Sequence, residues 1–508
     1  MIEAAFAQLR LAASLALGLP FSPRSLDRII DNLQATRREF GGIDRSGAEL
    51  VQGPPLDPAA MRAVHLRRFR AQARRASRET AYYAELFARL ALDPTRLRWE
   101  DLGRIPPTPK AALRARPDDF VCRDAQATLN CTTTGTTGRP TNVCFSNYEM
   151  QTYIAFSTIG HLVAGTLSEA DILHIATSSR AMLSNICAIG AAQRVSTLVL
   201  TGGLIEPAQT LALLAQERSI SGKHERTSVL LSYPSYLGEL VETGLRLGYR
   251  PTDFGLKRIF VGSEMVTAGL MARSQALFGA LTFSEGYGMT ETWPCNGTVC
   301  EQGHLHFEPS SALIEVCDLE TDAVAPPGAL GRLIVTPLPP YRDTTLLLRY
   351  DTEDLVQTLA EPPTCALRNL PAVTRMLGKR RLSVAVEGGW VYPRQVLEAL
   401  EALDCVPLPA RCGFWAVAGG VAVEVVARDT EPATRRQIEN ALEEQGVPLR
   451  ELHVYSDRSQ LRQPIPLRCD LKELSFGDAA SPPPPLDVWS FLSSRQREFT
   501  QNAFISSF

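Results

Sequence analysis

Short apolar runs alternate with amphipathic helical segments through residues 129–355, and this alternation constrains the fold more than any other feature. Two of the intervening segments, residues 208–216 and 236–247, carry apolar side chains at helical spacing. The strand-length apolar runs are residues 172–175, 197–200, 229–231 and 258–261. Strand–helix alternation of this kind predicts a largely parallel sheet that is covered by helices on both faces.

The rest of the chain predicts a multidomain α/β protein, because 508 residues exceed one ordinary core. We expect a large N-terminal domain over residues 1–378, with a helical lead-in over about 1–125. Strands near 313–316 and 333–335 are joined by turns, which predicts an antiparallel subdomain within it. A small, mobile α+β C-terminal domain is expected over 379–480. A Pro-rich tail over 481–508 would follow.

Composition excludes several classes of function. A net charge of -3 gives no reason to expect nucleic acid or an anionic membrane as a partner. The longest apolar runs fall far short of the ~20 residues that span a bilayer. The first 21 residues suggest an N-terminal helix rather than a signal peptide, because Glu3 precedes the apolar stretch and no clear cleavage site follows. The 11 scattered cysteines favour reduced thiols and a cytoplasmic location.

The run TTTGTTGRP at positions 132–140 combines many hydroxyls with two glycines. It could be a solvated turn, in which small polar residues bond to their own backbone. It could also be a phosphate cradle, because glycine lets the backbone approach an anion while amide and hydroxyl groups donate hydrogen bonds. The signature GxxxxGK[ST] is not met, since Gly135 and Gly138 are too close and Arg139 precedes a proline.

Four later stretches also carry candidate chemistry, although each could be an ordinary turn. Gly262-Ser263-Glu264 directly follows an apolar strand, where ligands of open α/β sheets collect. In the stretch EGYGMTET, residues 285–292, a tyrosine ring, a hydroxyl and a carboxylate suit an adenine face, a phosphate oxygen and Mg²⁺. The acidic turn LRYDTEDL at 348–355 could hold a ribose diol. The fourth stretch, at 378–393, begins with Gly-Lys and ends with Val-Tyr-Pro.

The order of these stretches resembles the motif order of adenylate-forming enzymes of the acyl-CoA synthetase-like superfamily. The phenylacetate–CoA ligase branch is the most similar, because Tyr82-Tyr83 and the stretch that ends in Thr108-Pro109-Lys110 look like its lead-in. The resemblance covers about residues 60–460. YGMTE followed by RYDTEDL at this separation is a specific signal, whereas the Thr/Gly loop alone is not.

The resemblance implies Mg·ATP as cofactor and assigns individual roles. The Thr/Gly loop would contact the β- and γ-phosphates, Thr290 the α-phosphate, and Glu291 would bind Mg²⁺. Asp354 would hold the ribose hydroxyls; Lys379 replaces the usual arginine and cannot donate in a fork. The residues assigned to ATP are Thr132, Thr133, Thr134, Gly135, Thr136, Thr137, Gly138, Arg139, Gly262, Ser263, Glu264, Gly286, Tyr287, Gly288, Met289, Asp354 and Lys379.

The same resemblance implies a small carboxylic acid as substrate. The segment near 177–189 should line the acyl pocket, and its lack of aromatic residues favours a small or polar-substituted aryl acid. The predicted pocket residues are Ser179, Arg180, Ser184, Asn185 and Gly288.

Some relatives of this branch carry Cys and His zinc ligands, and Cys300, His306 and Cys365 fall at similar places. A structural Zn²⁺ site needs a fourth ligand, for which Cys295 and His304 are the candidates. Buried thiols beside a surface histidine are the alternative.

The chain departs from the family in its small domain. The usual catalytic lysine of a GK pair is missing, and Arg468 and Lys472 are the candidate substitutes. Arg381 stands at the position where the family usually has an acidic hinge residue. Three functions therefore stay open: transfer of the acyl group to a thiol of coenzyme A or a carrier protein, transfer to an amine or hydroxyl, and a weakened nucleotide-binding relic.

Overall fold

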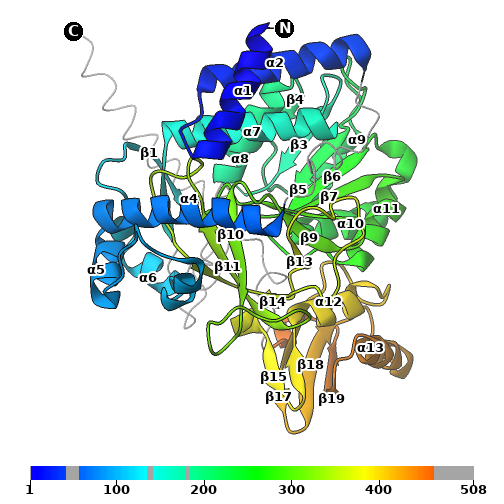
Figure 1. The fold of residues 1–508 in the computed structure, drawn as a ribbon. Coiled ribbons are helices and arrows are strands. Elements are labelled where there is room, and N and C mark those ends of the chain that lie inside the picture. Colours follow the sequence, from blue (N-terminus) through cyan, green and yellow to red (C-terminus); the bar gives the residue numbers. More distant parts are fainter. Residues whose placement is uncertain (1, 42–56, 134–140, 179–181, 463–508) are drawn as a thin grey trace, which may run out of the picture.

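The computed structural model describes residues 2–41, 57–133, 141–178 and 182–462 (Figure 1). Its centre is an eight-stranded sheet with the order β13-β9-β8-β7-β6-β5-β3-β4. Strands β4, β3, β5, β6 and β7 are parallel, and β7, β8, β9 and β13 pair antiparallel. The bounds are β3 Ile172–Ala176, β4 Leu198–Leu200, β5 Val229–Ser232, β6 Arg258–Gly262, β7 Thr282–Tyr287, β8 Gly297–Val299, β9 His304–Phe307 and β13 Ala372–Thr374.

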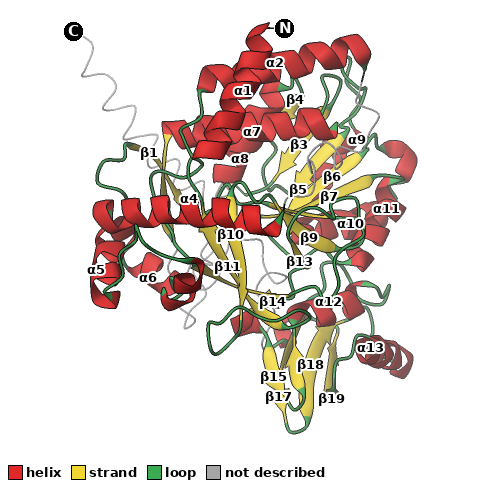
Figure 2. Cartoon of the chain, viewed as in Figure 1, coloured by secondary structure: helices red, strands yellow, loops and turns green. Residues whose placement is uncertain are grey.

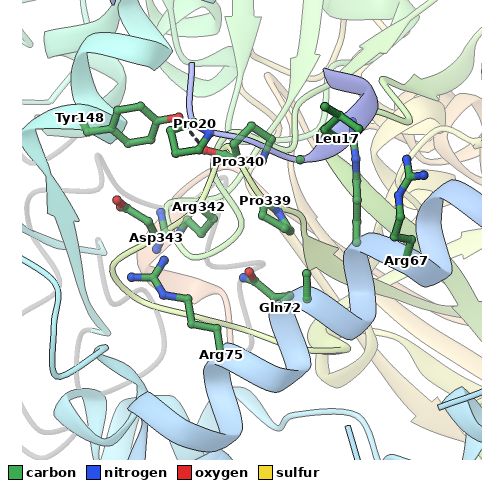
Figure 3. Close-up of a pocket in the computed structure, with 13 residues that line it drawn as sticks. Leu17, Pro20, Arg67, Gln72, Arg75, Tyr148, Pro339, Pro340, Arg342 and Asp343 are labelled. Atoms are coloured by element: carbon green, nitrogen blue, oxygen red, sulfur yellow. Dashed lines mark hydrogen bonds between the residues drawn. The ribbon is translucent and has the colours of Figure 1, made fainter. Parts of the chain in front are cut away.

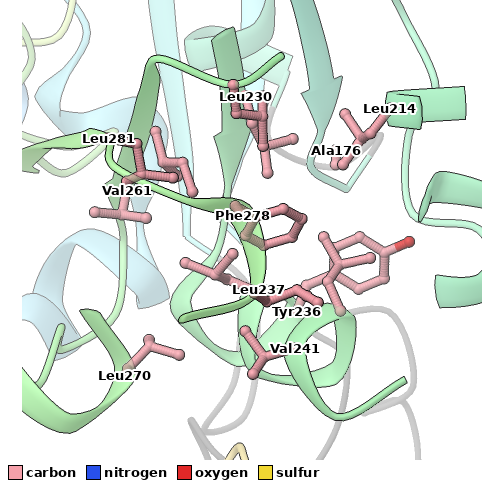
Figure 4. Close-up of a cluster of buried hydrophobic side chains, with 14 of the residues drawn as sticks. Ala176, Leu214, Leu230, Tyr236, Leu237, Val241, Val261, Leu270, Phe278 and Leu281 are labelled. Atoms are coloured by element: carbon pink, nitrogen blue, oxygen red, sulfur yellow. The ribbon is translucent and has the colours of Figure 1, made fainter. Parts of the chain in front are cut away.

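Helices cover both faces of the parallel strands, as the alternating sequence predicts. Because successive strand residues point to opposite faces, Leu230 packs under helices α9, α10 and α11, while Val229 packs under α2, α7 and α8. Figure 4 shows the first of these clusters, in which Leu237 and Phe278 meet Leu230. The helix bounds are α1 Ile2–Leu17, α2 Pro23–Phe40, α7 Asn147–Ala164, α8 Met182–Arg194, α9 Pro207–Ala215, α10 Pro234–Leu247 and α11 Ala268–Phe278.

The antiparallel subdomain is a second, four-stranded sheet with the order β10-β11-β12-β14. The lead-in helices pack against it, and the fully buried Arg349 joins the two layers. Its guanidinium donates to the carbonyl of Leu102 at 3.0 Å and to Glu315 Oε2 at 3.1 Å. The bounds are β10 Ala312–Cys317, β11 Leu330–Pro337, β12 Tyr350–Gln357, β14 Gly378–Lys379, α4 Pro58–Glu79, α5 Ala81–Leu90, η1 Trp99–Arg104, α6 Lys110–Ala115 and η2 Pro117–Phe120.

A small α+β unit follows Lys379 and lies at the lower end of the molecule in Figure 2. Its core joins α12 and α13 to a three-stranded sheet. It packs on α11, where the Ala268 amide donates to Glu398 Oε2 at 2.9 Å and Thr267 donates to Glu401. The bounds are β15 Val384–Val386, β16 Gly389–Val391, α12 Pro393–Glu401, β17 Cys412–Val417, β18 Gly420–Val426, α13 Pro432–Glu444 and β19 Leu449–Tyr455.

The helices of the described chain include none that is both long enough and apolar enough to cross a membrane.

Candidate active site

Three predicted nucleotide residues meet where β7, β12 and β14 come together. Tyr287, the last residue of β7, donates its hydroxyl to Asp354 Oδ2 at 3.0 Å. Lys379 Nζ lies 2.8 Å from Asp354 Oδ1 and also donates to the Thr352 carbonyl at 2.9 Å. The antiparallel register of β12 and β14 sets Asp354 opposite Lys379. Burial and the nearby Asp354 carboxylate raise the pKa of Tyr287 well above its usual value, so the ring hydroxyl stays protonated.

Glu291, the predicted Mg²⁺ ligand, lies in a buried electrostatic cluster. Its Oε1 is 3.0 Å from Nζ of Lys110, the first residue of α6, and accepts the Tyr350 hydroxyl at 3.3 Å. Burial alone would raise the pKa of Glu291. Favourable interactions, led by those with the Lys110 ammonium, lower this pKa by a larger amount, so the net pKa lies below its usual value. Glu291 is therefore a carboxylate at neutral pH, which is the form that binds a divalent cation. The sequence motifs assign no role to Lys110 or Tyr350.

The Gly262–Glu264 segment approaches the same edge of the sheet from β6. Gly262 pairs with Gly286, and a Cβ at Gly262 would lie 2.8 Å from the Gly286 carbonyl oxygen. Ser263 has φ +68°, so the chain turns sharply as it leaves the strand. Glu264 accepts from the amide and the hydroxyl of Ser235 at 2.8 and 3.0 Å, at the start of α10. The Glu264 carboxylate thus caps a helix beside the predicted adenine pocket.

The Thr/Gly loop starts from a hairpin, β1 (Ala127–Thr132) and β2 (Asn142–Ser146). At its base, Thr132 Oγ1 donates to Asn142 Oδ1 at 2.9 Å, and the amide of Thr133 donates to the Thr141 carbonyl at 2.9 Å. The predicted phosphate residues Thr134, Gly135, Thr136, Thr137, Gly138 and Arg139 lie outside the described residues.

The turn after β7 is half-buried at Gly288, Met289 and Thr290. Met289 packs against the core formed by the lead-in helices. A Cβ at Gly288 would lie 2.7 Å from Asn296 Oδ1, so a larger residue there would displace the Asn296 side chain.

The predicted acyl residues follow the carboxyl end of β3. Asn185 Oδ1 accepts from Thr177 Oγ1 at 2.6 Å, and Asn185 Nδ2 donates to the Ser178 carbonyl at 3.0 Å. Ser184 lies beside Asn185 in α8. Ser179 and Arg180 lie outside the described residues. Because β3 and β7 are parallel strands of one sheet, Asn185 and Tyr287 lie at the same sheet edge, where α/β proteins bind ligands.

A separate cluster of soft ligands forms where β9 meets the segment that contains Cys365. The ligand atoms of Cys300, His304, His306 and Cys365 all lie within 4.8 Å of one another. Cys365 Sγ is 3.2 Å from His306 Nε2, and burial lowers the pKa of His306, which favours the neutral, metal-binding ring. His304 occupies the fourth place, whereas Cys295 packs in the core between the two larger sheets. Two thiols and two imidazoles are a donor set that fits tetrahedral Zn²⁺.

Of the small-domain candidates, Arg468 and Lys472 lie outside the described residues. Arg381 lies in a short 3-10 helix, Arg380–Leu382, that directly follows β14.

The comparison with known families agrees with this geometry. The family model described as AMP-binding enzyme matches residues 59–336, more than half of the chain. The chain therefore belongs to the AMP-binding enzyme family. Among curated proteins, none is significantly similar to it.

The chain also shares its fold with solved structures of 2-hydroxyisobutyryl-CoA ligase. The structure of the postadenylation state, bound to R3-HIB-AMP, has a TM-score of 0.67 at 18% identity. The structure of the thioesterification state, with 2-HIB-AMP and CoA, has a TM-score of 0.56 at 18% identity. Each match covers 87% of this chain and 94% of the other. At these identities the likeness shows the fold, a large sheet flanked by helices with added antiparallel sheets. The phenylacetate–CoA ligase branch is not singled out.

Proposed function

We propose that this AMP-binding enzyme activates a small carboxylic acid with ATP and then transfers the acyl group to a thiol. The observation that carries the proposal is the contact set at the sheet edge: Tyr287 and Lys379 on Asp354, beside the buried carboxylate of Glu291. A ring, a carboxylate and an ammonium suit an adenosine, because the ring covers a base and the carboxylate accepts from a ribose diol.

In the first step, a carboxylate oxygen of the acid attacks the α-phosphorus, the bond to the bridging oxygen breaks, and pyrophosphate leaves. Glu291 would hold Mg²⁺, which supplies charge stabilisation to the phosphates when bound. The Lys110 ammonium is a second positive charge beside the Glu291 carboxylate. The chain contributes mainly by positioning and by electrostatic stabilisation, since negative charge accumulates on oxygens.

The acid is proposed to be small, with a polar-substituted aryl acid preferred. The amide of Asn185 in the acyl segment accepts from the Thr177 hydroxyl and donates to the Ser178 carbonyl, so its orientation is fixed before a substrate enters. Reduced thiols on all the cysteines that the structure describes fit a cytoplasmic enzyme.

The acceptor is proposed to be coenzyme A or a carrier thiol. The ligase structure with the similar fold has been solved with both an acyl-adenylate and CoA, which supports a thiol acceptor for this chain. An amine or hydroxyl acceptor is the second candidate, because Arg381 replaces the hinge acid on the segment that joins the two domains.

The test is a pyrophosphate-release assay with a panel of carboxylic acids, with and without coenzyme A, followed by mass spectrometry. Glu291→Gln should remove most Mg²⁺-dependent turnover, whereas Glu320→Gln, an exposed carboxylate in the turn after β10, should leave it unchanged. Unchanged kinetics in Glu291→Gln would contradict acid activation. Free adenylate without acyl-CoA, together with acylation of an added amine or phenol, would contradict the thiol acceptor. ATP binding without pyrophosphate release for any acid would identify a nucleotide-binding relic.

A further inference from the structure

Helix α1 presents an apolar face to solvent. On its inner side, Ala7 is buried, and Leu11 and Leu15 pack against the core cluster shared by α2, α7 and α8. On its outer side, Phe6 is 68% exposed and Leu9 is 66% exposed. The helix is therefore apolar on the side that covers the core and also on the side that faces away from it.

The exposed apolar residues of α1 form one continuous stripe. At 3.6 residues per turn they fall within an arc of about 140° around the helix axis. The exposed Gln8 borders this arc on one side, and the exposed Arg10 borders it on the other. An apolar arc of this width is typical of a helix face that packs against another element. The residues of this α1 stripe are Ala5, Phe6, Leu9, Ala12, Ala13, Ala16 and Leu17.

The neighbouring helix α2 lies in the same layer, at the end of the molecule opposite the small C-terminal unit (Figure 1). Its outer face is charged, and the signs balance. Arg28 pairs with Glu3 at 3.2 Å, and Arg38 pairs with Glu169 at 2.7 Å. Both helices precede residues 59–336, the range that the family model matches, so the family core does not explain the apolar outer face of α1. The exposed charged residues of α2 are Arg24, Asp27, Arg28, Asp31, Arg38 and Glu39.

The area of the α1 stripe matches what a specific interface requires. Leu17 at the end of the helix is 63% exposed, and Leu19 shortly after it is 51% exposed. Burial of the stripe together with Leu19 would remove roughly 600 Å² of surface from one chain, so two copies would reach the ~1,200 Å² lower limit for specific interfaces. A lipid surface fits less well, because helices that lie on membranes carry a surplus of Lys and Arg on the polar side. The balanced charges of α2 provide no such surplus.

We propose that the α1 stripe is the interface of a homodimer, in which two copies of α1 pack antiparallel across a twofold axis. A twofold interface uses the same patch on both copies, so the patch must be complementary to itself. The α1 stripe meets this condition when the axis passes near residue 11. Each large side chain then fills the space above an alanine of the other copy, which lets the two helices approach closely. The facing pairs are Phe6 with Ala16, Leu9 with Ala13, and Leu17 with Ala5.

Charges at the ends of the stripe favour the antiparallel direction. Glu3 precedes the stripe, and its pair with Arg28 in the same chain is exposed and therefore weak. At the other end, Arg67 of α4 lies beside Leu17, where both border a cavity of about 340 Å³ (Figure 3). Arg67 donates to the carbonyl of Ala16, which carries no charge. Antiparallel pairing brings Glu3 of each copy toward Arg67 of the other, whereas parallel pairing would bring like charges together.

The test is sedimentation equilibrium on the full chain at roughly 1–50 µM. The mass of the parent should approach twice the 55.6 kDa of one chain, with a dissociation constant of roughly micromolar size. Leu9→Glu and Ala13→Glu should each weaken the dimer about a hundredfold or more, because each buries a carboxylate without a partner. Leu245→Glu makes the same change at a leucine of α10 that is 50% exposed, and it should leave the dimer intact. Circular dichroism should show the parental helix content in all three variants, since each changed side chain is exposed in the single chain.

Cross-linking with a short bismaleimide tests the direction of pairing. Ala12→Cys lies close to the twofold axis and should cross-link to its copy. The two side chains of Phe6→Cys would be roughly 15 Å apart along the helix axes and should not cross-link. The parent, whose described cysteines are buried or half-buried, is the control. Cross-linking of both variants would overturn the antiparallel arrangement.

The inference is overturned if the parent is a monomer at every concentration, or if Leu9→Glu and Ala13→Glu form the dimer as tightly as the parent. A monomer that floats with phosphatidylserine vesicles, and that loses this binding in Leu9→Glu, would overturn the second copy in favour of a lipid surface. Each of these outcomes is measured without turnover, so acid activation stands or falls on its own assay.

Discussion

The ion pair between Lys110 and Glu291 is the contact whose removal has the clearest energetic consequence. Lys110→Met keeps the length of the side chain and deletes its charge. The side chains of Lys110 and Glu291 are 14% and 2% exposed, so the variant leaves a carboxylate buried without its cation. Breaking a buried pair in this way costs about 3–5 kcal/mol. Tyr350 still donates to Glu291 at 3.3 Å, which places the expected loss near the lower limit.

The loss should depend on pH in a direction that the structure fixes. In the parent, the pKa of Glu291 is lowered, so the group contributes stability above the unfolded-state pKa of about 4.3 and loses it as the pH falls through the folded-state value. Without Lys110, burial raises that pKa instead. The variant is then least stable relative to the parent at high pH. As the pH falls, the difference in unfolding free energy between parent and variant should shrink by about 1.4 kcal/mol per pH unit while Glu291 of the variant takes up its proton.

The measurement is urea unfolding at pH 8, 7 and 6, followed by tryptophan fluorescence. Lys110→Met in a Glu291→Gln background is the matched control, because a neutral amide needs no cation. In the Glu291→Gln background, Lys110→Met should lower the free energy of unfolding by less than about 1 kcal/mol. The double-mutant cycle thereby isolates the interaction between Lys110 and Glu291. A loss that is the same at pH 8 and pH 6, or that is equally large in the Glu291→Gln background, would refute the reasoning.

Three further predictions follow from other contacts. Asp354→Ala should weaken ATP binding at least tenfold, since a charged acceptor contributes about 1.5–3 kcal/mol per hydrogen bond. Calorimetry measures the affinity, and Tyr287→Phe serves as the milder comparison. An affinity of Asp354→Ala equal to that of the parent would contradict the prediction. Protein purified without chelator or metal resin should contain one zinc per chain by elemental analysis. That zinc should be lost in Cys300→Ser and kept in Cys317→Ser, a buried thiol outside the cluster; substoichiometric zinc indifferent to Cys300 would refute the site. Gly269→Ala should loosen the small domain and speed its proteolysis, because a Cβ there would lie 2.3 Å from the Glu401 carbonyl oxygen; unchanged cleavage would show that the contact is dispensable.

The fold could be read from the sequence because its signals are local. The apolar run at 172–175 is β3, Ile172–Ala176, and the helical spacing at 236–247 is α10, Pro234–Leu247. The antiparallel turn-linked strands are β10 and β11. These patterns depend on neighbouring residues alone, so a single sequence carries them.

The site was harder to predict from the sequence, because its contacts join residues that are far apart along the chain. Lys110 opens a six-residue helix and has no local pattern that points to Glu291. Glu264 was assigned to the adenine pocket by the family resemblance, and its hydrogen bonds to Ser235 depend on where α10 begins. His304 offers a better signal: it alternates with His306 along β9, and alternate strand residues share a face.

The pairing of Asp354 with Lys379 has a consequence for how such a chain could evolve. Lys379, which pairs with the proposed ribose ligand Asp354, is the last residue of the large domain's sheet, so both partners of this contact precede the small domain. A recombination junction just beyond position 379 would exchange the C-terminal module and leave the ribose contacts untouched. The incoming module would have to fit at least two close backbone contacts, because a Cβ at Gly269 would lie 2.3 Å from the Glu401 carbonyl oxygen and a Cβ at Gly238 would lie 2.8 Å from the Pro409 nitrogen. An exchange of modules at this junction would therefore be limited by the packing at Gly238 and Gly269 rather than by the ribose contacts.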